Sequence, residues 1–283
     1  MVTYSYEIPP MTASEQVRFR DFIEGEFGIK MPATKKSLLE NRLYRRVEAC
    51  GLKSYGAYLD FVTSDAGSED EFLRFSDLVS THETSFFRES AHFDYLKESV
   101  LPSLCRESER HKLSILSAAC STGEEAYCLG MIADAALNDL GRKDILLSVE
   151  GLDLSSRAIS IAQRGVYLEK NTLNIPDGLR RRYFMVSKDK TKDLCRVVPE
   201  LRQITSFHTG NLLGDTGLEY RHYDIIFCRN VLIYFNQERQ GSVITMLIGH
   251  LYPGGLLFLG HAESIIGFNL PASIVSRAVF RKN

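Results

Sequence analysis

The sequence lacks the features of several large protein classes. No segment approaches the roughly 20 consecutive apolar residues of a membrane-spanning helix, so we expect no direct membrane insertion. The first ten residues carry no charged stretch followed by an apolar one, so no secretory signal is predicted. The six cysteines are scattered and form no C-x-x-C pair, which argues against a zinc cage or a disulfide framework and predicts a cytoplasmic protein. The formal net charge is only -2, without the basic excess typical of general nucleic-acid binding, so no nucleic-acid partner is expected.

Apolar residues at helical spacing dominate the first part of the chain. Residues 12–16 offer caps for a helix that runs through Phe19, Phe22 and Ile23. No strand pattern is found in this part, so an all-helical domain over residues 1–90 is predicted. Its further helices are expected over residues 34–49, 54–63 and 70–79.

The pattern changes near residue 113 to strands that alternate with helices. Residues 113–120 form a short apolar run typical of a buried strand, the chain turns at 121–123, and a helix is predicted over 124–138. This alternation predicts an α/β domain over residues 91–283 with a mainly parallel sheet. Further strands are expected over 145–154, 222–228, 255–260 and 274–281, and further helices over 155–164 and 237–250.

Residues 171–207 interrupt the alternation. A short helix is predicted over 176–184, and short strands over 193–201 and 204–207. We interpret this segment as a small antiparallel β-subdomain inserted in the α/β domain.

Ligands of open α/β sheets bind at the carboxyl ends of the strands. The turn at residues 118–125 and the acid Asp153 occupy such positions. A dinucleotide site needs G-x-G-x-x-G, and only Gly123 is present, so S-adenosylmethionine is favoured over a nicotinamide cofactor. Two structural alternatives stay open: Thr122 with Glu125 fits a helix capping box, and Asp153 could cap the helix that follows it.

Four separated segments resemble the chemotaxis receptor methyltransferase family, CheR. They are T-S-F-F-R-E at residues 84–89 with His92 and Phe93, S-T-G-E-E at 121–125, C-R-N-V-L-I-Y-F at 228–235, and G-H-A-E-S at 260–264. The resemblance implies a class I S-adenosylmethionine-dependent methyltransferase domain, Rossmann-like, with an N-terminal all-helical domain and an inserted β-subdomain. It implies that the enzyme methylates glutamate side chains in the cytoplasmic region of chemotaxis-type receptors and releases S-adenosylhomocysteine, and we expect a monomer.

The resemblance also implies the site residues. Arg88 and Tyr234 would lie near the transferred methyl group as catalytic residues. His82 stands where the family often has asparagine, which puts a cofactor contact by His82 in doubt. The residues implied around the cofactor are Thr84, Arg88, Glu125, Asp153, Asn211, Leu212, Arg229 and Asn230.

A glutamate substrate is already ionised at pH 7, since its pKa is near 4.3, so neither a general base nor a metal is expected. The arginine fork of Arg88 suits the orientation of a carboxylate. Lys35, Arg42 and Arg46 fall on one side of a helix and form a basic stripe, which we interpret as the docking surface for an acidic receptor helix. The alternatives are a methyltransferase of the same fold with another substrate, or a non-catalytic S-adenosylmethionine-binding regulator.

Overall fold

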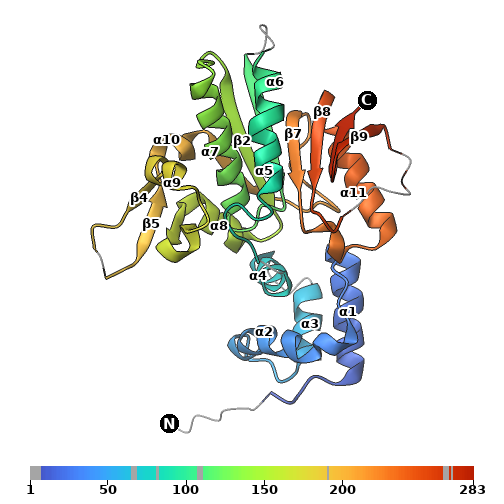
Figure 1. Cartoon of the computed structure of the whole chain (residues 1–283). Coiled ribbons are helices and arrows are strands. Elements are labelled where there is room, and N and C mark those ends of the chain that lie inside the picture. The colour runs from blue at the N-terminus through green and yellow to red at the C-terminus, as the bar shows by residue number, and fades with distance from the viewer. Residues whose placement is uncertain are drawn as a thin grey trace. The chain divides into compact units, whose positions relative to one another are not determined.

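The chain folds into two units (Figure 1). The helical unit extends to residue 81 and includes 234–236, and the sheet unit holds 82–233 with 237–283. The predicted boundary lay at residue 90, but Phe86 and Phe93 are buried in the core of the sheet unit, so the segment that carries them belongs with the sheet. The computed structural model describes residues 8–64, 69–80, 83–106, 111–189, 191–263, 268 and 270–283.

Four α-helices form the helical unit within its described residues. The predicted caps of the first helix are confirmed: the Thr12 hydroxyl accepts from the Glu15 amide at 3.2 Å, and the Glu15 carboxylate accepts from the Thr12 amide at 2.7 Å. Phe19 packs near Phe75 with ring centroids 6.1 Å apart, and both rings are buried. The helices are α1 (Ala13–Phe27), α2 (Lys36–Ala49), α3 (Tyr55–Thr63) and α4 (Glu69–Val79), with the 3-10 turn η1 (Ala33–Lys35) before α2.

The sheet unit is built on a seven-stranded sheet in the order β6-β2-β1-β7-β8-β10-β9. The strands from β6 to β8 in this order pair in parallel, and β10 pairs antiparallel with β8 and β9. Every residue of β7 is buried, as a strand covered on both faces requires, so the predicted mainly parallel sheet is confirmed. The strands are β1 (Lys112–Ala118), β2 (Leu146–Asp153), β6 (Thr205–Thr209), β7 (Tyr223–Cys228), β8 (Leu251–Leu259), β9 (Ala272–Ser276) and β10 (Val279–Lys282).

Helices cover this sheet. Helix α7 packs on β1 and β2, α8 packs on β2 and β6, and α11 packs on β8, as Figure 1 allows the reader to follow. Within the described ranges, no helix is long and apolar enough to cross a membrane. The helices are α5 (Ala91–Tyr95), α6 (Leu101–Cys105), α7 (Glu124–Asp139), α8 (Ser156–Arg164) and α11 (Gln237–Gly249), with the π-helical turn η2 (Leu96–Val100) and the 3-10 turn η4 (Leu232–Tyr234).

The part of the chain between α8 and β6 forms a small antiparallel sheet with the strand order β3-β5-β4. The predicted inserted antiparallel subdomain is confirmed. The strand predicted over 204–207 does not belong to it, because Thr205–Thr209 joins the main sheet in parallel with β2. The Phe207 side chain fills the space above Gly151, where a Cβ would lie 2.5 Å from it, and this packing holds β6 in the main sheet. The elements are β3 (Val166–Leu168), η3 (Glu169–Thr172), α9 (Asp177–Tyr183), β4 (Phe184–Val186), β5 (Leu194–Val197) and α10 (Pro199–Gln203).

The end of the chain also differs from the prediction. A single strand was expected over 274–281, but β9 and β10 form an antiparallel pair. Ala278 adopts a left-handed φ of 55° between them, which lets the chain reverse.

Candidate active site

The loop after β1 is fixed by the end of β2. Ala119 (φ 64°) and Ser121 (φ 49°) adopt left-handed backbone conformations, which residues with a side chain rarely do. The Cys120 amide donates to the Leu152 carbonyl at 2.9 Å, and the Ser121 amide donates to the Asp153 carboxylate at 2.7 Å. These two bonds hold a strained loop beside the carboxyl end of β2, where α/β sheets bind ligands.

Asp153 connects two loops rather than capping a helix. Its Oδ2 accepts from the Ser121 amide, and its Oδ1 accepts from the Ser155 amide at 2.9 Å. Helix α8 is capped by Ser155, whose hydroxyl accepts from the Ala158 amide at 3.0 Å. The alternative of Asp153 as a helix cap is therefore wrong.

Gly123 is required for packing. It adopts φ 95°, and a Cβ at this position would lie 2.7 Å from the Cβ of Ala162 on α8. The capping-box alternative is also wrong: the Thr122 hydroxyl donates to Glu124 at 2.6 Å, and no side chain caps α7. Glu125 therefore takes no part in capping α7.

Arg229 is the centre of a buried ionic network. Its side chain is 1% exposed, and it donates to the Glu125 and Glu89 carboxylates at 3.0 Å each and to the Arg88 carbonyl at 2.6 Å. The guanidinium also lies over the ring of Phe93, 5.5 Å from its centroid. One side chain therefore joins the 84–89 loop, the start of α7 and the turn after β7, which are three of the segments that carry the resemblance.

Glu125 is the second member of this network. Its Oε1 accepts from the Ser117 hydroxyl at 2.7 Å, and its Oε2 accepts from Arg229. Burial raises the pKa of Glu125, and the charge of Arg229 opposes that rise without cancelling it. Its contact with the cofactor stays a prediction.

Glu263 holds the turn after β7, a role that sequence analysis missed. Its carboxylate accepts from three backbone amides, those of Gly260 at 2.6 Å, Asn230 at 3.0 Å and Leu232 at 2.8 Å. Asn230 adopts a left-handed φ of 58°, and its side-chain amide donates to Glu89 at 3.1 Å. The carboxylates of Glu263 and Glu89 thus fix the backbone and side chain of a predicted cofactor residue. The only sequence signal for Glu263 was its place in the G-H-A-E-S segment.

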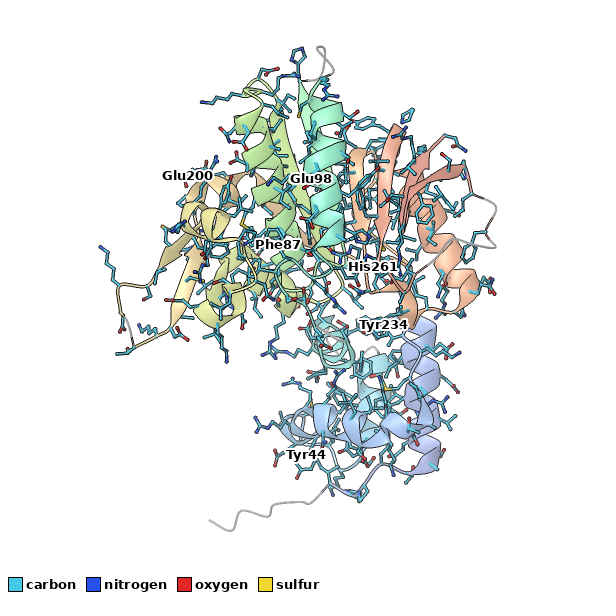
Figure 2. All side chains as sticks on the ribbon, viewed as in Figure 1. Tyr44, Phe87, Glu98, Glu200, Tyr234 and His261 are labelled. Carbon is cyan, nitrogen blue, oxygen red and sulfur yellow. The ribbon has the colours of Figure 1, made fainter. Side chains whose placement is uncertain are left out.

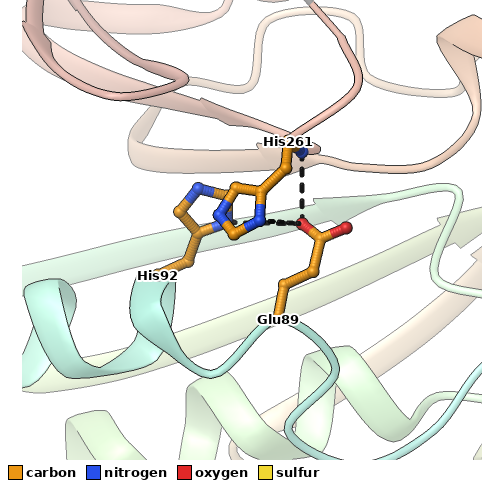
Figure 3. A group of neighbouring side chains, drawn as sticks. All are labelled: Glu89, His92 and His261. Atoms are coloured by element: carbon orange, nitrogen blue, oxygen red, sulfur yellow. Dashed lines mark hydrogen bonds and ion pairs between the residues drawn. The ribbon is translucent and has the colours of Figure 1, made fainter.

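Glu89, His92 and His261 form a compact group beside this network (Figure 3). The Glu89 carboxylate also accepts from the His261 amide at 3.3 Å. Burial opposes ionisation of Glu89, but hydrogen bonds from Asn230 and Arg229 outweigh it and lower the pKa to about 2. Burial, reinforced by the charge of Arg229, lowers the pKa of His92 to about 4.

The predicted catalytic residues lie in different units. Arg88 belongs to the sheet unit, is partly exposed and donates to the Glu83 carbonyl at 2.8 Å. Tyr234, marked in Figure 2, ends η4 and belongs with the helical unit, where its carbonyl accepts from the Lys30 amide at 2.9 Å. The catalytic roles of Arg88 and Tyr234 and the cofactor contact of the partly exposed Thr84 stay predictions. His82 lies outside the described residues.

Asn211 and Leu212 follow β6 in a tight turn. The Asn211 side chain accepts from the Leu213 amide at 3.0 Å, and the preceding Gly210 amide donates to the Asp153 carbonyl at 3.0 Å. The turn is therefore adjacent to the end of β2. The cofactor contacts of its residues stay predictions.

Two of the three predicted docking residues bind within the helical unit. Arg42 donates to the carbonyls of Val79, the last residue of α4, and of Ser80, which follows it, at 3.1 and 3.0 Å. Arg46 pairs with the buried carboxylate of Glu71, while Lys35 is exposed. The docking role of this stripe stays a prediction, and both arginines also stabilise the fold.

The residues around the first loop fit a nucleoside ligand. The Ser121 Oγ is buried and has no hydrogen-bonding partner among the described residues, and the Asp153 carboxylate is bonded to the amide of the same residue. A ribose carries hydroxyls that both donate and accept, so it suits a carboxylate beside an unsatisfied serine hydroxyl.

Comparison with known proteins identifies the family. Residues 82–279 match the family model described as "CheR methyltransferase, SAM binding domain", and residues 15–80 match "CheR methyltransferase, all-alpha domain". A chemotaxis protein methyltransferase of Borreliella burgdorferi is 30% identical and is covered over 95% of its length by 96% of this chain. Chemotaxis protein methyltransferase 1 of Pseudomonas aeruginosa is 35% identical (89% of this chain, 90% of the relative), and the Escherichia coli protein is 34% identical (87% and 83%). The chain belongs to the CheR methyltransferase family, and its cofactor is S-adenosylmethionine.

Proposed function

We propose that this protein methylates glutamate side chains in the cytoplasmic region of chemotaxis-type receptors. The observation that carries the proposal is the match along nearly the whole chain to relatives named chemotaxis protein methyltransferases. Both the helical and the sheet unit have a counterpart in the family. The protein would act in the cytoplasm, where such receptors present their signalling regions.

The chemistry asks for positioning rather than proton transfer. S-adenosylmethionine supplies an electrophilic methyl group on a sulfonium. A glutamate γ-carboxylate is ionised at pH 7 and attacks without a general base. The protein must hold the reacting atoms in line at about 3–3.5 Å.

The chain's own residues divide this task. Asp153 and the 118–125 loop would bind the nucleoside, since they lie together at the carboxyl ends of β1 and β2. Arg88 would orient the substrate carboxylate, because its guanidinium offers paired donors. Tyr234 would add a hydroxyl donor near the transferred methyl. The Arg229 network would hold the 84–89 loop and the turn after β7 in place for cofactor binding and for orientation of the substrate.

Docking of the receptor would use the basic stripe of Lys35, Arg42 and Arg46. Lys35 is exposed in η1, directly before α2, while Arg42 is partly buried against the end of α4. An acidic receptor helix would be steered toward such a surface, and salt would screen the attraction.

The test is transfer of a labelled methyl group from S-adenosylmethionine to membranes that contain the receptors. We expect label in the receptor that is released as methanol by mild alkali, as a methyl ester requires. Asp153→Asn, close in size to the wild type, is the matched control and should transfer less label when S-adenosylmethionine is limiting. Cofactor binding without any transfer would favour a regulator, and alkali-stable label would favour a methyltransferase with another acceptor.

A further inference from the structure

Glu89, His92 and His261 direct three potential metal-binding groups at one point (Figure 3). One donor atom from each residue lies within 4.8 Å of the other two. The Nδ1 atoms of both histidines are 3.9 Å from Oε2 of Glu89. The group combines the start of α5 with the turn after β8, so the fold rather than the local sequence assembles it.

His92 lacks the hydrogen bonds that a buried imidazole needs. The residue is 3% exposed, and neither ring nitrogen has a hydrogen-bonding partner among the described residues. The Arg277 backbone lies near the ring, but no contact to either ring nitrogen meets the geometry of a hydrogen bond. Buried polar atoms without partners are uncommon in folded proteins and point to a missing water or ion.

The charges nearby allow a cation. Arg229 is bonded to two carboxylates, Glu89 and Glu125, so its single charge is divided between them. These two carboxylates offset the positive charge of Arg229 at the proposed site.

We propose that Glu89, His92 and His261 form a binding site for a transition-metal ion of the zinc type. Two imidazoles and one carboxylate, completed by water, are a common tetrahedral zinc ligand set. Zinc bonds of about 2.0–2.1 Å place tetrahedral donors roughly 3.3 Å apart, so the donor separations of 3.9 Å and up to 4.8 Å must close by about 0.6 to 1.5 Å. The His261 side chain is 34% exposed and has room for this movement.

The test is titration of the full chain, freed of metal by a chelator, with Zn²⁺ in competition with a chromophoric indicator. We expect one Zn²⁺ per chain, and at least about a tenfold loss of affinity in His261→Ala and in His92→Gln. Mg²⁺, which prefers oxygen ligands, should not compete. His261 is exposed, so its variant keeps the test valid if the buried substitution unfolds the protein.

His222→Ala is the matched control. His222 is also exposed, and its ring centroid lies 6.4 Å from that of His250, so this pair is a competing place for adventitious zinc. The proposal expects His222→Ala to bind as the wild type does. It is overturned if the wild type binds no Zn²⁺ at a Zn²⁺ concentration of about 100 μM, because the dissociation constant would then lie above that concentration. It is equally overturned if His261→Ala binds unchanged, or if His222→Ala alone removes binding.

Discussion

Glu263→Gln tests how the turn after β7 is held. The wild-type carboxylate accepts from the amides of Gly260 and Asn230 with Oε2, and from that of Leu232 with Oε1. A glutamine retains one acceptor oxygen, so its NH₂ group must face at least one of these N–H donors. A hydrogen bond to a charged group contributes about 1.5–3 kcal/mol, and the remaining bonds also lose their charge. We expect the free energy of unfolding to fall by about 2–4 kcal/mol.

Two assays separate a local effect on the turn from general destabilisation. Urea unfolding gives the stability, and calorimetric titration with S-adenosylhomocysteine gives the affinity at a temperature where the variant is folded. Glu150→Gln is the control, since Glu150 is another buried carboxylate of the sheet unit and accepts from the Tyr223 hydroxyl. We expect both variants to lose stability but only Glu263→Gln to lose affinity, by about tenfold or more. Stability within about 0.5 kcal/mol of wild type for Glu263→Gln would refute the reasoning.

Three further outcomes are expected. Asp153→Asn should weaken binding of S-adenosylhomocysteine by about ten- to a hundredfold, because charge-assisted bonds to the ribose are lost; calorimetry that finds equal affinity in a folded variant contradicts the assignment. Arg46→Ala should lower the free energy of unfolding by about 3–5 kcal/mol, because Glu71, 3% exposed, loses the arginine that neutralises its charge. Lys35→Glu should leave stability unchanged and raise the KM for receptor. Burial raises the pKa of Glu71, but hydrogen bonds from Arg46 and Tyr58 lower it overall, so the ionised carboxylate stabilises the fold at pH values above its ordinary pKa near 4.5 and this stabilisation is lost as the pH falls below that value. Glu71→Gln should therefore reduce the fall of the free energy of unfolding at acid pH. An unchanged fall would assign it to other groups.

Local sequence signals predicted the elements that depend on residues close together in the sequence. The Thr12–Glu15 capping box lies within one helical turn, and the apolar run of β1 is typical of a strand buried on both faces. β3 was missed because three residues are too few to show a strand period. β6 was assigned to the wrong sheet because its position depends on the packing of Phe207 over glycines far away in the sequence.

The site was predictable only in part, because contacts between residues far apart in the sequence leave no local signal. The cofactor loop and Asp153 follow directly from strand ends, which periodicity locates. The bonds of Glu89 to Arg229 and of Glu263 to Asn230 join residues 140 and 33 positions apart, and no sequence spacing encodes them. The basic stripe was interpreted as a docking surface, and its spacing could not show that Arg42 and Arg46 also make tertiary contacts with the 71–80 segment.

The most direct test of the central claim is to locate the methyl group in the modified receptor. Receptor incubated with the enzyme and S-adenosylmethionine would be digested and its modified peptides sequenced by mass spectrometry. We expect methyl esters on glutamate side chains, and fewer of them at a limiting concentration of S-adenosylmethionine when the enzyme carries Asp153→Asn. Methylation of lysine or another side chain, or an equal yield of esters from the Asp153→Asn enzyme at that concentration, would contradict the account.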